Sequence, residues 1–267
     1  PSIQIQSQIA SFLDTKCSVI DSTIEKEREL IDKLKEYRQA VITEAVTKGI
    51  RPGVPMKDSG VEWIGEIPEG WKIIRLKNLS PVLRGASPRP IDDPMYFDDD
   101  GEYAWVRITD VSASDKYLNT GSYQLSELGA NKSVKLEPER LFVSICATVG
   151  KPCISKIKCC IHDGFVHFPD MDLRMNNYLY YVFSSGECYK GLGKMGTQLN
   201  LNTETVANIK IPFLSYESCE QIADYLDAKC SAIDATIQKR ELAIEKLTAY
   251  KQSLIYECVT GKREVQG

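Results

Sequence analysis

Histidine is scarce in this sequence, and no Cys-x-x-Cys pair occurs in it. Only His162 and His167 are present among 267 residues, although the chain has nine cysteines. Zinc sites are built from closely spaced cysteine and histidine ligands, and disulfide frameworks are typical of short secreted domains. The sequence therefore predicts no metal site and no disulfide scaffold, with the cysteines as reduced structural residues.

Long apolar runs are also missing. No stretch approaches the ~18 consecutive apolar residues of a membrane-spanning helix, and no charged-then-apolar leader is present. We therefore expect a cytoplasmic protein that has no membrane partner.

An excess of positive charge is the third feature that the sequence lacks. It has 33 Lys and Arg against 37 Asp and Glu, a net charge of −4. As an average this disfavours nucleic acid, but binding depends on where the basic residues lie. Six of the acidic residues fall between Asp92 and Glu102, and a phosphate backbone would avoid that loop.

Glycine and proline are absent from two segments, residues 8–47 and 221–260, which are copies of each other. Aligned without a gap at an offset of 213 residues, 22 of the 40 positions are identical. Such self-similarity indicates an internal duplication. The length and composition of each copy predict one long helix.

Within each copy the apolar residues recur at alternating steps of four and three, the narrow seam of a coiled coil. In an antiparallel pair the equivalent mid-helix residues Glu27 and Arg240 would meet, and a charged pair of this kind can fix the register. The alternative is that both charges extend into solvent. The predicted stalk-packing residues are Ile20, Ile24, Glu27, Ile31, Leu34, Val41, Ile233, Ile237, Arg240, Ile244, Leu247 and Leu254.

Start and stop signals delimit both helices. Ser2 and Ser215 are candidate N-caps, and Gly49 and Gly261 are candidate ends. An antiparallel pair would bring the chain back to the same end of the helices, with the size of one domain in between. The predicted organisation is a first stalk helix (1–48), a globular domain (49–214) and a second stalk helix (215–267).

The intervening segment changes character. Four stretches rich in β-branched and aromatic residues predict strands: 71–79, 103–111, 140–150 and 152–162. Residues 176–185 and 202–209 predict short helices. The mixed order, without regular β-α-β alternation, predicts an α+β fold.

Three short motifs suggest chemistry. "DPMY" (93–96) resembles the Asp-Pro-Pro-Tyr loop of adenine-N6 methyltransferases, and "GLGKMG" (191–196) matches Gly-x-Gly-x-x-Gly. "IHDGFVH" (161–167) offers two histidines and Asp163. Each also has a plain interpretation as a loop or strand end, and no nucleophile, base and orienting partner come together. We predict no enzyme and no cofactor, with a small adenine methyltransferase as the alternative.

Basic and polar residues on the predicted loops and strands of the domain suggest DNA binding. Arg, Asn and Gln can make bidentate contacts to base edges, and Lys contacts phosphates. The predicted DNA-facing residues are Arg84, Ser87, Arg89, Arg107, Lys194, Gln198 and Asn200.

Three segments together resemble the specificity subunit of type I restriction–modification systems. The duplicated helix that begins at Gln8 resembles the conserved helical regions of that family. "DSGVEWIGEIPEGWKIIRLKNL" (58–79) is similar to the start of its target recognition domain, and "LNLNTETVANIKIPFLS" (199–215) is similar to the end. The resemblance covers essentially the whole chain.

This resemblance implies a target recognition domain on an antiparallel helical spacer, with double-stranded DNA as ligand. It also implies two kinds of partner: modification subunits, which methylate adenine using S-adenosylmethionine, and restriction subunits, which translocate and cleave DNA using ATP. The specificity subunit itself does no chemistry.

The chain departs from that family in its helix–domain–helix order, because a full specificity subunit has two recognition domains. Either a first domain was removed, or the subunit is naturally half-size and forms a homodimer through its stalk helices. A coiled-coil adaptor that does not bind DNA is the remaining alternative.

Overall fold

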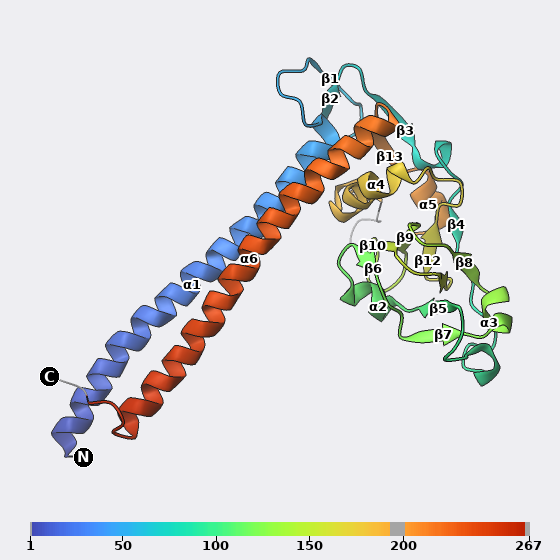
Figure 1. The fold of residues 1–267 in the computed structure, drawn as a ribbon. Helices are drawn as coiled ribbons and strands as arrows, with labels where there is room; N and C mark the ends of the chain where they lie inside the picture. Colours follow the sequence, from blue (N-terminus) through green and yellow to red (C-terminus); the bar gives the residue numbers. More distant parts are fainter. Residues whose placement is uncertain (1, 193–200, 265–267) are drawn as a thin grey trace. The chain divides into compact units, whose positions relative to one another are not determined.

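Two long helices dominate the computed structural model, which describes residues 2–192 and 201–264. Helix α1 spans Ile3–Lys48 and helix α6 spans Tyr216–Val259, and they run side by side (Figure 1). The Ser215 hydroxyl accepts a hydrogen bond from the Ser218 N–H at 3.2 Å, so it caps α6. Gly49, with φ 77°, follows the last residue of α1. These start and stop signals are as the sequence predicted.

The chain divides into two compact units. The first contains the residues up to Ala40 and those from Asp227 onward, and the second spans Val41–Leu226. In the first unit the helices are antiparallel, because Asp21 pairs with Lys251 at 2.6 Å whereas Arg38 pairs with Asp234 at 2.9 Å. The predicted α+β class with an antiparallel helix pair is confirmed.

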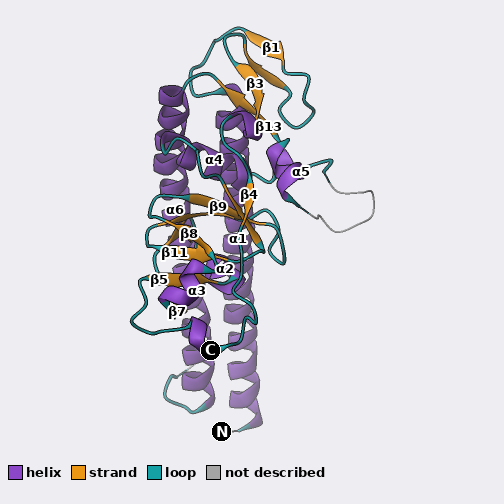
Figure 2. Cartoon of the chain, turned by 90° about the vertical axis from the view of Figure 1, so that its right-hand side faces the viewer, coloured by secondary structure: helices purple, strands orange, loops and turns teal. Residues whose placement is uncertain are grey.

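Within the described residues of the second unit, the strands form two larger and two smaller sheets (Figure 2). The first larger sheet contains, in spatial order, β4 (Leu83–Arg84), β12 (Phe165–His167), β9 (Leu141–Ser144), β10 (Pro152–Ser155) and β6 (Tyr117–Leu118). The second contains β7 (Tyr123–Leu125), β5 (Tyr103–Val106), β11 (Cys159–Ile161) and β8 (Val134–Leu136). The smaller ones pair β1 (Met56–Asp58) with β2 (Glu66–Pro68), and β3 (Lys72–Arg75) with β13 (Lys210–Phe213). The pairs β5–β11 and β6–β10 are parallel and the other pairs are antiparallel.

Short helices connect these strands. They are α2 (Ile108–Ala113), α3 (Glu127–Asn131), α4 (Arg174–Ser184) and α5 (Thr203–Ala207), with 3₁₀ turns η1 (Leu76–Asn78), η2 (Pro94–Tyr96) and η3 (Glu187–Tyr189). The predicted helices at 176–185 and 202–209 correspond to α4 and α5. Asn202 caps α5 by accepting a hydrogen bond from the Thr205 N–H at 2.8 Å.

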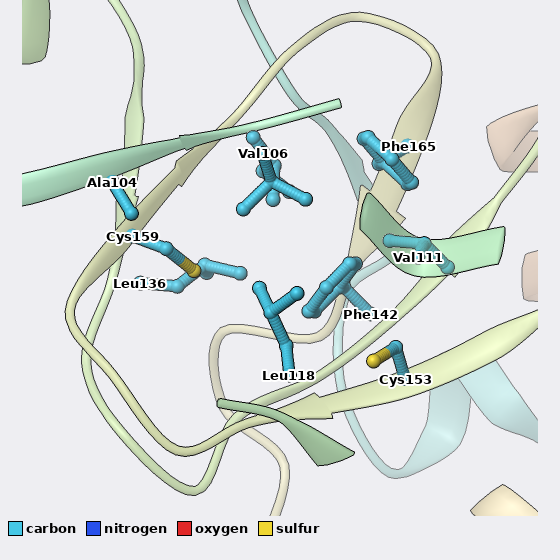
Figure 3. Packing of buried hydrophobic residues seen from close by; sticks show 10 residues of the cluster. Ala104, Val106, Val111, Leu118, Leu136, Phe142, Cys153, Cys159 and Phe165 are labelled. Carbon is cyan, nitrogen blue, oxygen red and sulfur yellow. The ribbon is translucent and has the colours of Figure 1, made fainter. Parts of the chain in front are cut away.

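A hydrophobic cluster of this unit lies between the two larger sheets (Figure 3). Val106 and Ile161 enter it from one sheet, and Phe142 and Phe165 from the other, all fully buried. The two phenylalanine rings meet edge to face with centroids 5.4 Å apart. Because side chains alternate along a strand, neighbouring Trp105 points the other way and packs in a second cluster.

Helix α4 is almost entirely buried, and one of its side chains ties distant segments together. The Tyr178 hydroxyl lies 2.9 Å from the Pro212 carbonyl and 3.1 Å from the Val46 carbonyl. Burial raises the pKa of this phenol far above its ordinary value. Tyr178 therefore remains a neutral donor between β13 and the last turn of α1.

The four predicted strands are each only partly correct. β3 ends at Arg75 and η1 follows it, β9 ends at Ser144, and the stretch 152–162 contains two strands, β10 and β11, which lie in different sheets. The sequence favoured a strand over 103–111, but β5 ends at Val106 and α2 begins at Ile108. The Asp110 carboxylate accepts a hydrogen bond from the Arg107 N–H at 2.8 Å, which caps the helix. This local capping ends the strand despite the β-branched residues that follow.

All nine cysteines lie in the described chain, and all are free thiols. Burial raises the pKa of Cys153 and of Cys160 to about 12, so these thiols stay protonated. Cys146, which follows the end of β9, is exposed. Among the described residues, no helix is both long and apolar enough to cross a membrane.

Candidate nucleic-acid interface

Main-chain hydrogen bonds hold the segment from Arg84 to Arg89 against β12 and β11. Arg84 ends β4, opposite Val166 of β12. Beyond it, the Gly85 N–H donates to the Phe165 carbonyl at 3.0 Å and the Ala86 N–H to the Ile161 carbonyl at 3.1 Å. This segment therefore crosses directly over the turn that joins β11 to β12.

Gly85 is the residue that permits this close crossing. A Cβ atom at this position would lie 2.2 Å from the carbonyl oxygen of His162 and 2.7 Å from that of Ile161. No side chain fits at such distances. The Ser133 hydroxyl donates to the Ala86 carbonyl at 2.7 Å and lies 3.3 Å from the Ile161 carbonyl.

Three of the predicted DNA-facing residues come together at Asp163, in the turn below this segment. The Ser87 hydroxyl donates to Asp163 Oδ1 at 3.1 Å, and Arg89 Nη2 to Asp163 Oδ2 at 3.2 Å. Arg84 Nε donates to the Asp163 main-chain carbonyl. In the sequence Asp163 stands out only as part of "IHDGFVH", and no local signal links it to residues more than 70 positions earlier.

The charge of Asp163 is secured by these contacts. Burial favours the protonated acid, but the Ser87 hydrogen bond and the Arg89 and Arg84 charges outweigh it, so the pKa of Asp163 lies below its ordinary value of 3.8. The Arg89 side chain nevertheless remains 72% exposed. An exposed guanidinium with an anchored edge is suited to contact a further ligand.

The backbone of Arg89 is held independently of its side chain. The hydroxyl of Tyr96, a buried residue, donates to the Arg89 carbonyl at 2.9 Å. Lys132 Nζ lies 5.6 Å from the centre of the same ring. The position of Arg89 is therefore set by η2 as well as by β4.

Arg107, also predicted to face DNA, lies elsewhere. Its guanidinium stacks over the Tyr123 ring, with Cζ 4.0 Å from the ring centre, and Phe97 meets that ring edge on at 6.2 Å. These residues line a groove of about 800 Å³, which the sequence did not reveal. The same groove contains Asp98 and Asp99, so it disfavours phosphate.

The remaining predicted DNA-facing residues, Lys194, Gln198 and Asn200, lie outside the described residues. So do the last four positions of the "GLGKMG" motif.

The two histidines are largely buried. Burial lowers the pKa of His162 and of His167. His162 Nδ1 accepts a hydrogen bond from the Gly164 N–H at 2.8 Å, and its ring centre is 4.6 Å from that of Phe165. His162 is therefore neutral near pH 7, and it packs against Phe165 beside the groove that Arg107 lines.

The "DPMY" motif forms the 3₁₀ turn η2. The Asp93 carboxylate accepts a hydrogen bond from the Met95 N–H at 3.0 Å and so caps this turn. Within residues 2–192 and 201–264, no group of three or more His, Cys, Asp or Glu side chains is placed to hold a metal ion. What the geometry does offer is a set of fixed, exposed hydrogen-bond donors.

The predicted stalk-packing residues lie along α1 and α6. Ile20, Ile24 and Leu254 are buried together, with Ile244 and Leu247 against them. Ile31, Ile233 and Ile237 form a second cluster with Leu34 and Ile244. Between these clusters, Arg240 Nη1 lies 2.8 Å from Glu27 Oε2. Val41 is half-buried, whereas Ile42 beside it is fully buried.

Comparison with known proteins identifies related chains. A family model described as "Type I restriction modification DNA specificity domain" matches residues 68–246. Two specificity subunits of Methanocaldococcus jannaschii type I restriction enzymes, MjaX and MjaVIII, are each 26% identical to the chain over its whole length. The chain spans 59% and 62% of these relatives, about three fifths of their length.

Solved structures share the fold. One chain, from work described as the structural basis of complex assembly and conformational transition of the type I R-M system, has a TM-score of 0.77 at 18% identity. The alignment covers 97% of this chain and 60% of that one. The HsdS subunit of Thermoanaerobacter tengcongensis has a TM-score of 0.61 at 18% identity, covering 97% and 58%.

Proposed function

The chain belongs to the type I restriction–modification DNA specificity family, and we propose that it reads the DNA sequence at which the other subunits of such a system act. The recognition domain in this proposal spans residues 49–214. The helical regions 1–48 and 215–267 act as the spacer.

The arrangement at Asp163 is the observation that carries this proposal. Arg84, Ser87 and Arg89 present hydroxyl and guanidinium groups from one segment, and hydrogen bonds hold the backbone of this segment against the turn between β11 and β12. Specific readout requires donors that are held in place before DNA arrives, because ordering them on binding costs free energy. Arginine is the residue most often used for bidentate contacts to guanine.

Two kinds of subunit complete the proposed assembly. A modification subunit would methylate adenine near the bound site, and a restriction subunit would cleave, while this chain performs neither reaction. The capping role of Asp93 and the packing role of His162 support a non-catalytic chain. Calorimetry that detected tight S-adenosylmethionine binding by the isolated chain would contradict this assignment.

The experiment that tests DNA reading is titration of the chain, with and without modification subunits, against duplex DNA at several salt concentrations. Phosphate contacts release counterions, so we expect affinity to fall steeply as salt rises. Arg84→Ala should lower affinity by ~1–3 kcal/mol at a single base pair. Arg28→Ala, which removes an exposed arginine of the helix pair, is the matched control and should leave sequence preference unchanged. If the chain bound DNA with neither salt dependence nor sequence preference, even with modification subunits present, the proposal would be contradicted.

We further propose that two copies associate through their helices, which would give a symmetric pair of recognition domains. The support is a set of exposed apolar side chains on α6: Leu242, Tyr250 and Tyr256 are 48%, 51% and 55% exposed. Light scattering should find a dimer whose dissociation constant rises in Tyr250→Glu. A monomer at all accessible concentrations would exclude this association.

A further inference from the structure

The turn between β11 and β12 places one carboxylate against the proposed DNA-reading segment. Asp163 accepts from Ser87 and Arg89 through its two carboxylate oxygens. A guanidinium has five N–H donors, and Asp163 engages one nitrogen of Arg89. The other donors of the fork remain available on an exposed side chain.

A carboxylate in this position also affects phosphate binding. Arg84 and Arg89 carry two positive charges, and the Asp163 charge, 43% exposed on its side chain, offsets one of them. A DNA phosphate close to Arg89 would be repelled by Asp163, whereas a neutral base edge would not. Placing like charges side by side is a recognised way of rejecting the wrong partner.

We propose that Asp163 is a positioning residue for specificity: it orients the Arg89 guanidinium toward base edges and lowers the affinity of this segment for phosphate. This inference rests on the proposed DNA-reading function and assigns a role to a residue that contacts DNA only through its neighbours.

Arg84 provides an internal comparison. Its anchor is the main-chain carbonyl of residue 163, which no substitution of the Asp163 side chain removes. The carboxylate itself accepts hydrogen bonds from Ser87 and Arg89 and lies 3.7 Å from His162 Nδ1. Neutralising Asp163 should therefore change the readout made by Arg89 and leave the readout made by Arg84 intact.

The test uses the full chain at low salt with a pool of randomised duplex DNA, from which bound duplexes are sequenced. Asp163→Asn should weaken the base preference of the selected motif at the base pairs where Arg89→Ala also weakens it. It should leave unchanged the preference at the base pairs that depend on Arg84. The preference for the selected duplex over random duplex should fall roughly tenfold, the discrimination of one good bidentate contact.

Salt dependence gives a second readout that a merely structural role would not move. A freed Arg89 can contact a phosphate, so the slope of log affinity against log salt for random duplex should steepen by about 0.9 in Asp163→Asn. Asp163→Glu, which keeps the charge, should retain the original slope. Glu139→Gln is the matched control, because it neutralises a half-exposed carboxylate paired with Lys156 and changes net charge equally.

The outcomes separate the two ideas. If the unaltered chain selects no motif and shows no salt-dependent binding, with or without modification subunits, the proposed function fails and this inference fails with it. If it selects a motif but Asp163→Asn gives the same motif and the same slope, or if Glu139→Gln reproduces the change, the role of Asp163 alone is overturned. The circular dichroism spectrum of Asp163→Asn must match that of the unaltered chain for these comparisons to apply. Arg89→Lys leaves Asp163 in place, and it should weaken the preference at the same base pairs even if Asp163→Asn fails to fold.

Discussion

Arg240 Nη1 lies 2.8 Å from Glu27 Oε2, although the two residues occupy the same position in the two copies of the repeat. Their side chains are 32% and 24% exposed. The duplication thus placed opposite charges where an antiparallel pair brings a residue against its own equivalent. Apolar clusters lie on both sides of this contact, so a shifted register would leave both charges against apolar neighbours.

Two single truncations and a charge exchange test this contact. Glu27→Ala or Arg240→Ala should each lower the free energy of unfolding by about 1–2 kcal/mol, between the values for exposed and buried ion pairs. The exchanged pair, Glu27→Arg with Arg240→Glu, should regain most of the loss. Urea denaturation followed by circular dichroism measures the free energy of unfolding of each variant. An exchanged pair that is no more stable than either alanine variant would show that the two residues do not interact.

The apolar seam predicts that truncating a buried isoleucine of α1 lowers the free energy of unfolding much more than truncating an exposed valine of the same helix. Ile24→Ala removes a side chain that is 7% exposed and should cost ~2–4 kcal/mol, the range for buried aliphatic truncation. Val19→Ala alters a side chain that is 62% exposed and should cost less than ~0.5 kcal/mol. Equal effects in thermal unfolding would contradict the observed seam.

Gly85→Ala should disturb the DNA-reading segment. The added methyl group would lie 2.2 Å from the His162 carbonyl, so the backbone must shift, at a cost of ~1–3 kcal/mol. We expect loss of both stability and DNA affinity. Gly70→Ala is the matched control, because a Cβ there meets nothing within 4 Å. An unchanged melting temperature in Gly85→Ala would show that the crossing is looser than observed.

Acid should destabilise the unit that contains the histidines. Burial lowers the pKa of His167 below 6.5, so the unfolded chain takes up a proton at a higher pH than the folded chain does. The stability that neutral His167 contributes is therefore fully present above pH 6.5 and is lost as the pH falls from there to the pKa of the folded chain. The loss is about 1.4 kcal/mol for each unit by which the folded pKa lies below the unfolded one.

The comparison to make is urea denaturation at pH 7.5 and pH 5.5. His167→Gln should reduce the difference in free energy of unfolding between the two pH values, whatever it costs at each of them, because Gln does not titrate. His162→Gln should act in the same direction, since burial also lowers the pKa of His162. If the difference in the two variants equals that of the unaltered chain, the loss at acidic pH comes from other groups.

The helix pair could be predicted in some detail because a long helix is a local and repetitive structure. Its period, its caps at Ser2 and Ser215 and its end at Gly49 are each written within a few residues. The mixed domain offered less. Strands such as β4 and β6 have two residues each, too few to show an alternating pattern.

What the sequence by itself determined was the antiparallel helix pair, because the duplicated seam and its charges repeat within one element and need no distant partner to be recognised. Only the tertiary structure decided that Arg84, Ser87 and Arg89 gather at Asp163. That contact depends on β4 and β12 pairing across about 80 residues of chain, and on a glycine at position 85 that lets two backbones touch. Such a meeting is set by packing of the whole domain, and no pattern along the chain encodes it locally.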